Sequence, residues 1–202
     1  MAEHQPAKLA AMEGHYPASE AADAYIIGWV NEETEEVSGI AVPGLLSFLV
    51  HWDFEEPVTG LRAFPPDKRP PVNIVFQSYH AMVMIGVFLI VLSWIGLLFW
   101  WRKQLFNYRW LLYIMVFSVL GPQLANQLGW ITAEVGRQPY IVYGLLETKN
   151  SLSPSVEAGE VIASLVMFGL IYLLLFVLFI YLLNGKIQHG PEEAELETGH
   201  LA

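Results

Sequence analysis

Glu134 and Arg137 are the residues of this sequence whose types and spacing most clearly suggest chemistry. They stand three residues apart, just after an apolar run, 111–128, that is long enough to cross a membrane. If the helix persists to Arg137, the two side chains lie on one helical face. A charged residue at the centre of a membrane helix costs about 3 kcal/mol, and less near the end, so Glu134 must face protein, a cofactor or water.

Two interpretations of this pair stay open. In the simpler one, Glu134 and Arg137 form an ion pair that closes the helix at the membrane interface. In the other, the carboxylate takes part in ligand or proton chemistry, and Arg137 holds a partner anion. The surrounding residues have to decide between them.

His80 and Met82 are the next candidates, near the start of another apolar segment. Residues two apart point about 200° away from each other around a helix, so one metal ion does not easily bind both. Met82 shares its face with the small residues Ser78 and Gly86, which leave room for a flat group such as a porphyrin. A methionine in a membrane helix is, however, far more often packed than bound to metal. A histidine near the interface is usually just hydrogen-bonded.

The composition is that of a membrane protein. Of the 202 residues, 54% are hydrophobic and 15% are charged, and the apolar residues come in blocks. The absence of cysteine excludes disulfides, thiolate metal sites and iron–sulfur clusters. A net charge of −10 argues against a nucleic-acid partner. No signal peptide is predicted at Met1.

We therefore predict an all-α membrane protein with three transmembrane helices in the region 73–184. The expected spans are about 73–101, 110–128 and 161–183. Gly121 and Pro122 predict a kink in the second span. The short connection 102–109 carries three basic residues and no acid, which places it on the cytoplasmic side.

Residues 1–72 then lie outside the cytoplasm and are soluble in character, with twelve acidic and four basic residues. A short helix is predicted for 8–13, and a β-hairpin is predicted around 31–36. The apolar stretch 40–52 is too short to span a bilayer, which favours a membrane-surface or re-entrant piece. The acidic C-terminal tail, 185–202, is expected to be disordered and cytoplasmic.

Three stretches resemble subunit I of the cytochrome bd-type quinol oxidases, and specifically its C-terminal half. They are 5–13 (QPAKLAAME), 77–82 (QSYHAM) and 129–139 (GWITAEVGRQP). The first and third are highly specific motifs, and the similarity runs from about residue 3 to the end of the third span. The resemblance implies a membrane enzyme that oxidises quinol and reduces oxygen to water. It also implies a low-spin haem b, a high-spin haem b and a haem d.

The resemblance assigns roles to the residues that match the family motifs. Lys8 and Glu13 match quinol-binding positions, which makes 1–72 a quinol-loop-like segment. Met82 matches the axial ligand of the low-spin haem b, for which a thioether is suitable. His80 replaces a family arginine, and a titratable group beside a haem propionate would shift the potential of that haem.

The third motif is expected to serve the paired haem centre at which oxygen is reduced. Glu134 matches a carboxylate ligand there, whether to the high-spin haem b or to haem d. Trp130 matches an aromatic residue beside those haems, and Arg137 matches a cation near their propionates. These three residues are the catalytic candidates, and Met82 and Glu134 are the expected ligands to iron.

The histidine ligands of the family belong to an N-terminal half that this sequence lacks. We expect either a split-gene product that assembles with a separately encoded N-terminal half, or a truncated reading frame. The expected partners are that half, oxidase subunit II, membrane quinol and the bilayer of a bacterial or archaeal plasma membrane. Two alternatives are an inactive fragment and a small proton- or ion-translocating subunit that uses Glu134 and Arg137.

Overall fold

The computed structural model describes residues 1–151, 153 and 155–189 of the chain. The chain forms two units, Met1–Ser151 and Leu152–Ala202. Three helical stretches are long and apolar enough to cross a membrane, namely Val72–Trp101, Arg109–Val135 and Ala158–His189. They correspond to the three predicted spans, although the second ends at Val135 instead of Leu128. Its last turns carry polar residues that lower the local hydropathy and hide the continuation of the helix from a sequence reading.

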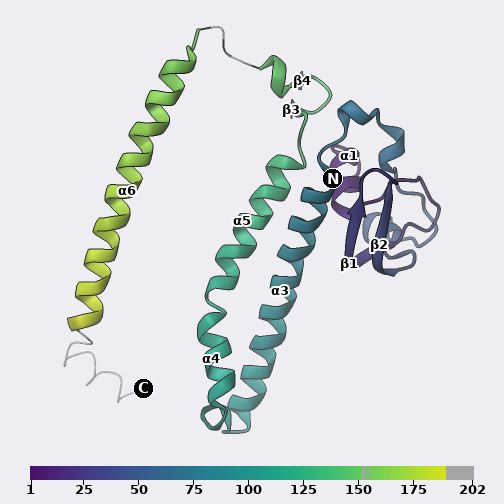
Figure 1. The fold of residues 1–202 in the computed structure, drawn as a ribbon. Helices are drawn as coiled ribbons and strands as arrows, with labels where there is room; N and C mark the ends of the chain where they lie inside the picture. The colour runs from purple at the N-terminus through teal and green to yellow at the C-terminus, as the bar shows by residue number, and fades with distance from the viewer. Residues whose placement is uncertain (152, 154, 190–202) are drawn as a thin grey trace. The chain divides into compact units, whose positions relative to one another are not determined.

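A helical hairpin forms the body of the first unit (Figure 1). Helix α3 (Val72–Trp101) packs against a second arm made of α4 (Arg109–Phe117) and α5 (Leu120–Val135). The second arm breaks at 118–119, one turn before Pro122. Because proline has no N–H to bond the carbonyl of Ser118, the Gly121 N–H bonds that carbonyl instead, at 2.8 Å.

Small residues bring α3 and α5 close together. The Ser78 hydroxyl lies 2.8 Å from the Thr132 hydroxyl. Gly129 faces Met82, since a Cβ added at this glycine would lie 2.8 Å from Met82 Sδ. Small side chains and hydroxyl pairs of this kind let membrane helices approach closely.

The chain is mostly helical, as predicted, but the segment before α3 contains both helices and strands. Helix α1 (Pro6–Glu13) starts with proline in its first turn and ends at Gly14, which has a φ of 64°. Strands β1 (Ala24–Asn31) and β2 (Glu36–Val42) form the predicted antiparallel hairpin, and α2 (Leu45–His51) follows them.

This segment builds its core on the first turns of α3 (Figure 1). The buried cluster joins residues of α1, β1 and α3, namely Ala10, Ala11, Met12, Val30, Val75 and Phe76 among others. A second small hairpin, β3 (Tyr140–Val142) and β4 (Leu146–Glu147), follows α5 and was not predicted. Glu147 forms ion pairs with Lys68 and Lys149, and the first of these fastens the small hairpin to the approach to α3.

The second unit contains helix α6 (Ala158–His189), in which no residue is buried. The helix includes 185–189, which the sequence analysis placed in the tail. The rest of that predicted disordered tail, 190–202, lies outside the described residues.

Candidate functional site

Glu134 and Arg137 meet at the end of α5, as the simpler interpretation of their spacing predicted. Arg137 Nη2 lies 3.4 Å from Glu134 Oε1, and both side chains are about half exposed. Trp130, one turn earlier, is 66% exposed. A carboxylate exposed at the end of an apolar helix needs a partner other than lipid, whereas an indole is also favoured at the membrane interface.

Lys8 joins α1 to this end of α5. Its ammonium donates a hydrogen bond to the carbonyl oxygen of Ala133 at 3.0 Å, although the residues are 125 positions apart. Lys8 is 8% exposed, and the aliphatic part of its side chain lies against Gly136. A cation that bonds a carbonyl of the last turn stabilises a helix C-terminus.

The electrostatic surroundings of Lys8 place it in the same site as the ion pair. Burial lowers the pKa of the Lys8 ammonium, the Arg137 cation lowers it further, and the Glu134 carboxylate opposes both. The first and third sequence motifs therefore form one cluster.

Glu13 lies in a second cluster, at the other end of α1. It is 5% exposed, and burial raises the pKa of its carboxyl. Two neighbours on α3 partly offset this effect, namely the His80 ring and a hydrogen bond with Tyr79. Tyr79 was missed in the sequence, although it stands inside the QSYHAM motif. A buried carboxyl with a raised pKa is suited to exchanging protons.

His80 fastens α3 to the hairpin. Its Nδ1 lies 2.9 Å from the carbonyl oxygen of Phe76, and its Nε2 lies 2.7 Å from the carbonyl oxygen of Tyr25. The imidazole also stacks on the Phe76 ring, with centroids 4.0 Å apart. Both ring nitrogens are thus engaged by backbone oxygens.

Met82 points to a different element from His80, as the 200° separation predicted. Its sulfur lies against Gly129 of α5, and a Cβ added at Gly86, one turn further along α3, would meet nothing within 4 Å. The thioether is thus packed against α5, and the open space one turn further along α3 is where a flat group such as a haem could lie within reach of this soft donor. Among the described residues, no three His, Asp or Glu side chains gather as a metal centre of their own.

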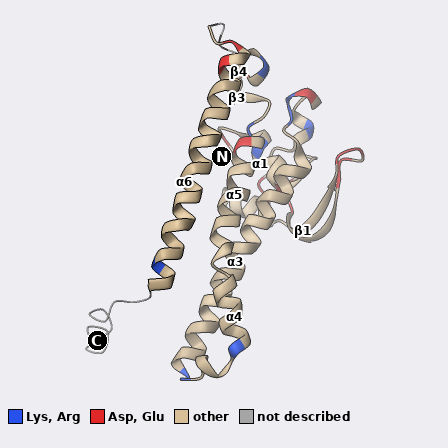
Figure 2. Cartoon of the chain, turned by 60° about the vertical axis from the view of Figure 1, so that its left-hand side comes forward, with Lys and Arg blue, Asp and Glu red and all other residues tan. Residues whose placement is uncertain are grey.

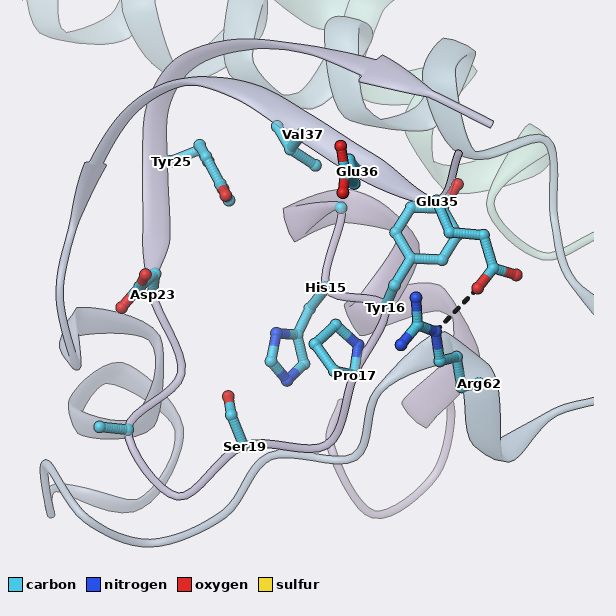
Figure 3. A pocket seen from close by; sticks show the side chains of 12 residues that line it. His15, Tyr16, Pro17, Ser19, Asp23, Tyr25, Glu35, Glu36, Val37 and Arg62 are labelled. Atoms are coloured by element: carbon cyan, nitrogen blue, oxygen red, sulfur yellow. Dashed lines mark hydrogen bonds and ion pairs between the residues drawn. The ribbon is translucent and has the colours of Figure 1, made fainter. Parts of the chain in front are cut away.

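A separate cavity of about 510 Å³ lies between the end of α1 and the β1–β2 hairpin (Figure 3). Its wall is about equally polar and apolar, and the side chains of His15, Asp23, Glu35 and Arg62 supply polar groups to it. Arg62 Nε donates to Glu35 Oε2 at 2.8 Å, which closes one side. Neither Lys8 nor Glu13 lines this cavity, so it does not coincide with the predicted quinol site.

Comparisons with known proteins match this chain to one family. The family model of cytochrome bd terminal oxidase subunit I matches residues 1–191. The chain is 37% identical over 201 residues to cytochrome bd ubiquinol oxidase subunit 1 of Bacillus subtilis (strain 168), covering 94% of the chain and 43% of the relative. It is 24% identical over 264 residues to cytochrome bd-II ubiquinol oxidase subunit 1 of Escherichia coli (strain K12), covering 98% of the chain and 51% of the relative.

A solved structure of a bd oxidase is also similar to this chain. The bd oxidase from Geobacillus thermodenitrificans superimposes with a TM-score of 0.72 at 34% sequence identity. The match covers 94% of this chain and 43% of that one. The chain thus spans less than half the length of this protein and of the Bacillus relative.

Proposed function

Because the chain belongs to the family of cytochrome bd terminal oxidase subunit I, we propose that it supplies the quinol-oxidising and haem-holding part of a respiratory quinol:oxygen oxidoreductase. The observation that carries this proposal is the bond from Lys8 to Ala133. It ties the helix that carries the quinol motif to the helix end that carries Glu134. Quinol oxidation and oxygen reduction would then take place on neighbouring parts of one rigid unit.

At the quinol site, Glu13 would accept a proton from the quinol hydroxyl. Its burial favours the protonated carboxyl, while His80 and Tyr79 favour the carboxylate. This balance suits a group that must take up a proton and release it again. Lys8 would hold α1 in place through its hydrogen bond to the Ala133 carbonyl. When that bond breaks, the freed ammonium would hydrogen-bond the quinol.

At the haem sites, Met82 would hold the low-spin haem b from one side through its thioether. Glu134 would provide a carboxylate ligand at the paired high-spin haem b and haem d centre, with Trp130 beside it and Arg137 near the propionates. When bound, these haems carry electrons singly and activate oxygen. The role of His80 beside a propionate stays a prediction, because both its ring nitrogens face carbonyl oxygens.

The remaining partners would supply the haem ligands that this chain does not provide and would cover its exposed site residues. A separately encoded N-terminal half would provide the histidine ligands and cover Trp130 and Glu134, and oxidase subunit II would complete the complex. The expected location is the plasma membrane, with residues 1–71 outside and the C-terminus in the cytoplasm. The connection between α3 and α4 carries basic residues, and no acidic residue stands between Asp67 and Glu134 (Figure 2).

The test compares two methionines of α3. The chain is co-expressed with the N-terminal half of subunit I and with subunit II of the Bacillus relative, and reduced-minus-oxidised absorption spectra of the purified complex are recorded. Met82→Leu should remove the low-spin haem b bands and lower quinol oxidase activity by more than about tenfold, since an iron ligand is lost. Met84→Leu, at an exposed position two residues on, should retain both.

Two results would contradict the proposal at different points. Unchanged low-spin bands in Met82→Leu would show that the ligand is another residue. A wild-type complex that assembles but contains no haem would identify the chain as an inactive fragment.

A further inference from the structure

The β1–β2 hairpin and α2 leave several large apolar side chains uncovered. We call the set the apolar patch, and it consists of Ile27, Trp29, Ile40, Leu49, Trp52 and Phe54. Ile40 is 67% exposed and Trp52 is 82% exposed. Ile27 lies opposite Ile40 on the hairpin, and Trp52 and Phe54 both pack on the Phe48 ring. Large apolar side chains left exposed on a folded segment mark an interaction surface.

Three hydrogen bonds fix the position of the hairpin along α3. They join Asn73 N to Glu32 Oε1 at 2.7 Å, Gln77 Nε2 to the Gly28 carbonyl at 2.8 Å, and His80 Nε2 to the Tyr25 carbonyl at 2.7 Å. As the numbering falls along β1, it rises along α3. The hairpin tip therefore lies at the start of α3, and the open end lies about 10 Å further along the helix.

The chemistry of the hairpin changes along this direction. The tip carries four glutamates, namely Glu32, Glu33, Glu35 and Glu36. Ile27 pairs with Ile40 nearer the open end. Helix α2 is attached at the open end, because the Ser47 hydroxyl accepts a hydrogen bond from Ala22 N at 2.9 Å. The hairpin is thus acidic at its tip, beside the start of the membrane helix (Figure 2), and its exposed side chains further along are apolar.

The length of α3 sets the depth of the open end in a bilayer. Its 30 residues span about 45 Å, whereas the hydrocarbon core is about 30 Å thick. The polar residues Asn73 and Gln77 place the excess length at the start of α3, so the first turns, which carry the hairpin, lie in the headgroup layer. The hairpin cannot lie deeper, in the hydrocarbon core, because the outer edges of a two-stranded sheet carry backbone groups that need to hydrogen-bond to water.

We propose that the apolar patch anchors the segment 1–71 in the interfacial layer of the bilayer. Tryptophan and phenylalanine favour this layer. The range 24–52 contains no Lys or Arg, so the anchor acts by burying apolar area and not by attracting anionic headgroups. It would hold α1, with Lys8 and Glu13, at a fixed height above the membrane helices. The proposal does not depend on haem or quinol.

The absence of cysteine in the chain permits a direct test. Single cysteines replace Ile40, Trp52 and, as the matched control at the tip, Glu33, and each carries a bimane fluorophore. The full chain is placed in vesicles of phosphatidylcholine, alone and as the assembled oxidase complex. Circular dichroism confirms that each variant keeps its helix content.

The expected result is opposite quenching at the two ends of the hairpin. Nitroxide on the lipid headgroups should quench labels at positions 40 and 52 more than about twofold better than the label at 33, and aqueous iodide should do the reverse. Iodide quenching at 40 and 52 equal to that at 33 would overturn the proposal. Shielding of 40 and 52 from both quenchers would overturn it too, and would show that another protein covers the patch.

Discussion

At the residue scale, Lys8 and Glu13 show how burial tunes two ionisable groups on one short helix. Burial disfavours the charged form of each, so the pKa of the Lys8 ammonium falls and that of the Glu13 carboxyl rises. Their partners differ: Lys8 bonds a helix end, whereas Glu13 faces Tyr79 and His80. One helix thus carries a residue that fastens it to α5 and, in the proposed function, a residue that exchanges protons with quinol.

The raised pKa of Glu13 makes the stability of the first unit depend on pH. For a carboxyl with a raised pKa in the folded state, the contribution to the free energy of unfolding is complete below its ordinary pKa. It is lost as pH rises through the folded-state value. Glu13→Gln should therefore gain stability over the wild type as pH rises, by at most about 1.4 kcal/mol per pH unit.

Thermal unfolding in detergent micelles, followed by circular dichroism from acid to neutral pH, measures this difference. Glu3→Gln, at an exposed position near the N-terminus, is the control and should track the wild type. A constant gap between Glu13→Gln and the wild type at every pH would show that folding does not raise the pKa of this carboxyl.

At the scale of elements, carboxylates of the hairpin tip fasten the hairpin to the segment 62–73, which leads into α3. Glu35 accepts hydrogen bonds from Arg62 at 2.8 Å and from Arg69 at 2.7 Å, and these donors hold the pKa of its carboxyl below its usual range. Glu32 bonds the N–H of Asn73 at the start of α3, where a carboxylate also complements the helix dipole.

Loss of the Glu35 carboxylate should loosen the hairpin without unfolding the membrane helices. Hydrogen–deuterium exchange in 24–42 should be a few-fold faster in Glu35→Gln than in the wild type, because local opening becomes easier. Glu33→Gln, on the same tip, should leave exchange unchanged. Equal exchange in the wild type and both variants would mean that the backbone hydrogen bonds alone hold the tip.

The elements also show what the sequence could and could not predict. Hydropathy and turn residues predict the three spans and the β1–β2 hairpin, and the three-residue spacing predicts the pair of Glu134 and Arg137. Contacts between distant segments carry no such local signal. The bond from Lys8 to Ala133 and the position of His80 between two carbonyls depend on how the segment 1–71 docks on α3 and α5. Strands β3 and β4 are too short for a periodic pattern to reveal them.

At the scale of the whole molecule, the distribution of charge predicts how the first unit crosses the membrane. Arg102, Lys103 and Arg109 stand around the turn between α3 and α4, whereas the acidic residues of this unit lie in 1–71 and from Glu134, in the last turn of α5, onward (Figure 2). Basic residues in short connections stay in the cytoplasm.

Labelling of single cysteines in intact cells checks this orientation. A membrane-impermeant maleimide should label Glu3→Cys directly, and it should label Gln104→Cys only after the membrane is permeabilised. Direct labelling at position 104 with protection at position 3 would mean that the topology is inverted.

The close register between α3 and α5 has a consequence for assembly. The two arms are joined by a short turn, and their contacts, from Gly96 with Met115 to Ser78 with Thr132, stay within one helical hairpin. Such local pairing forms quickly and needs no distant part of the chain. The spacing between Met82 and Glu134 is therefore set as soon as this hairpin leaves the translocon. A partner subunit that binds later would therefore meet a surface that is already formed and would not have to reshape it.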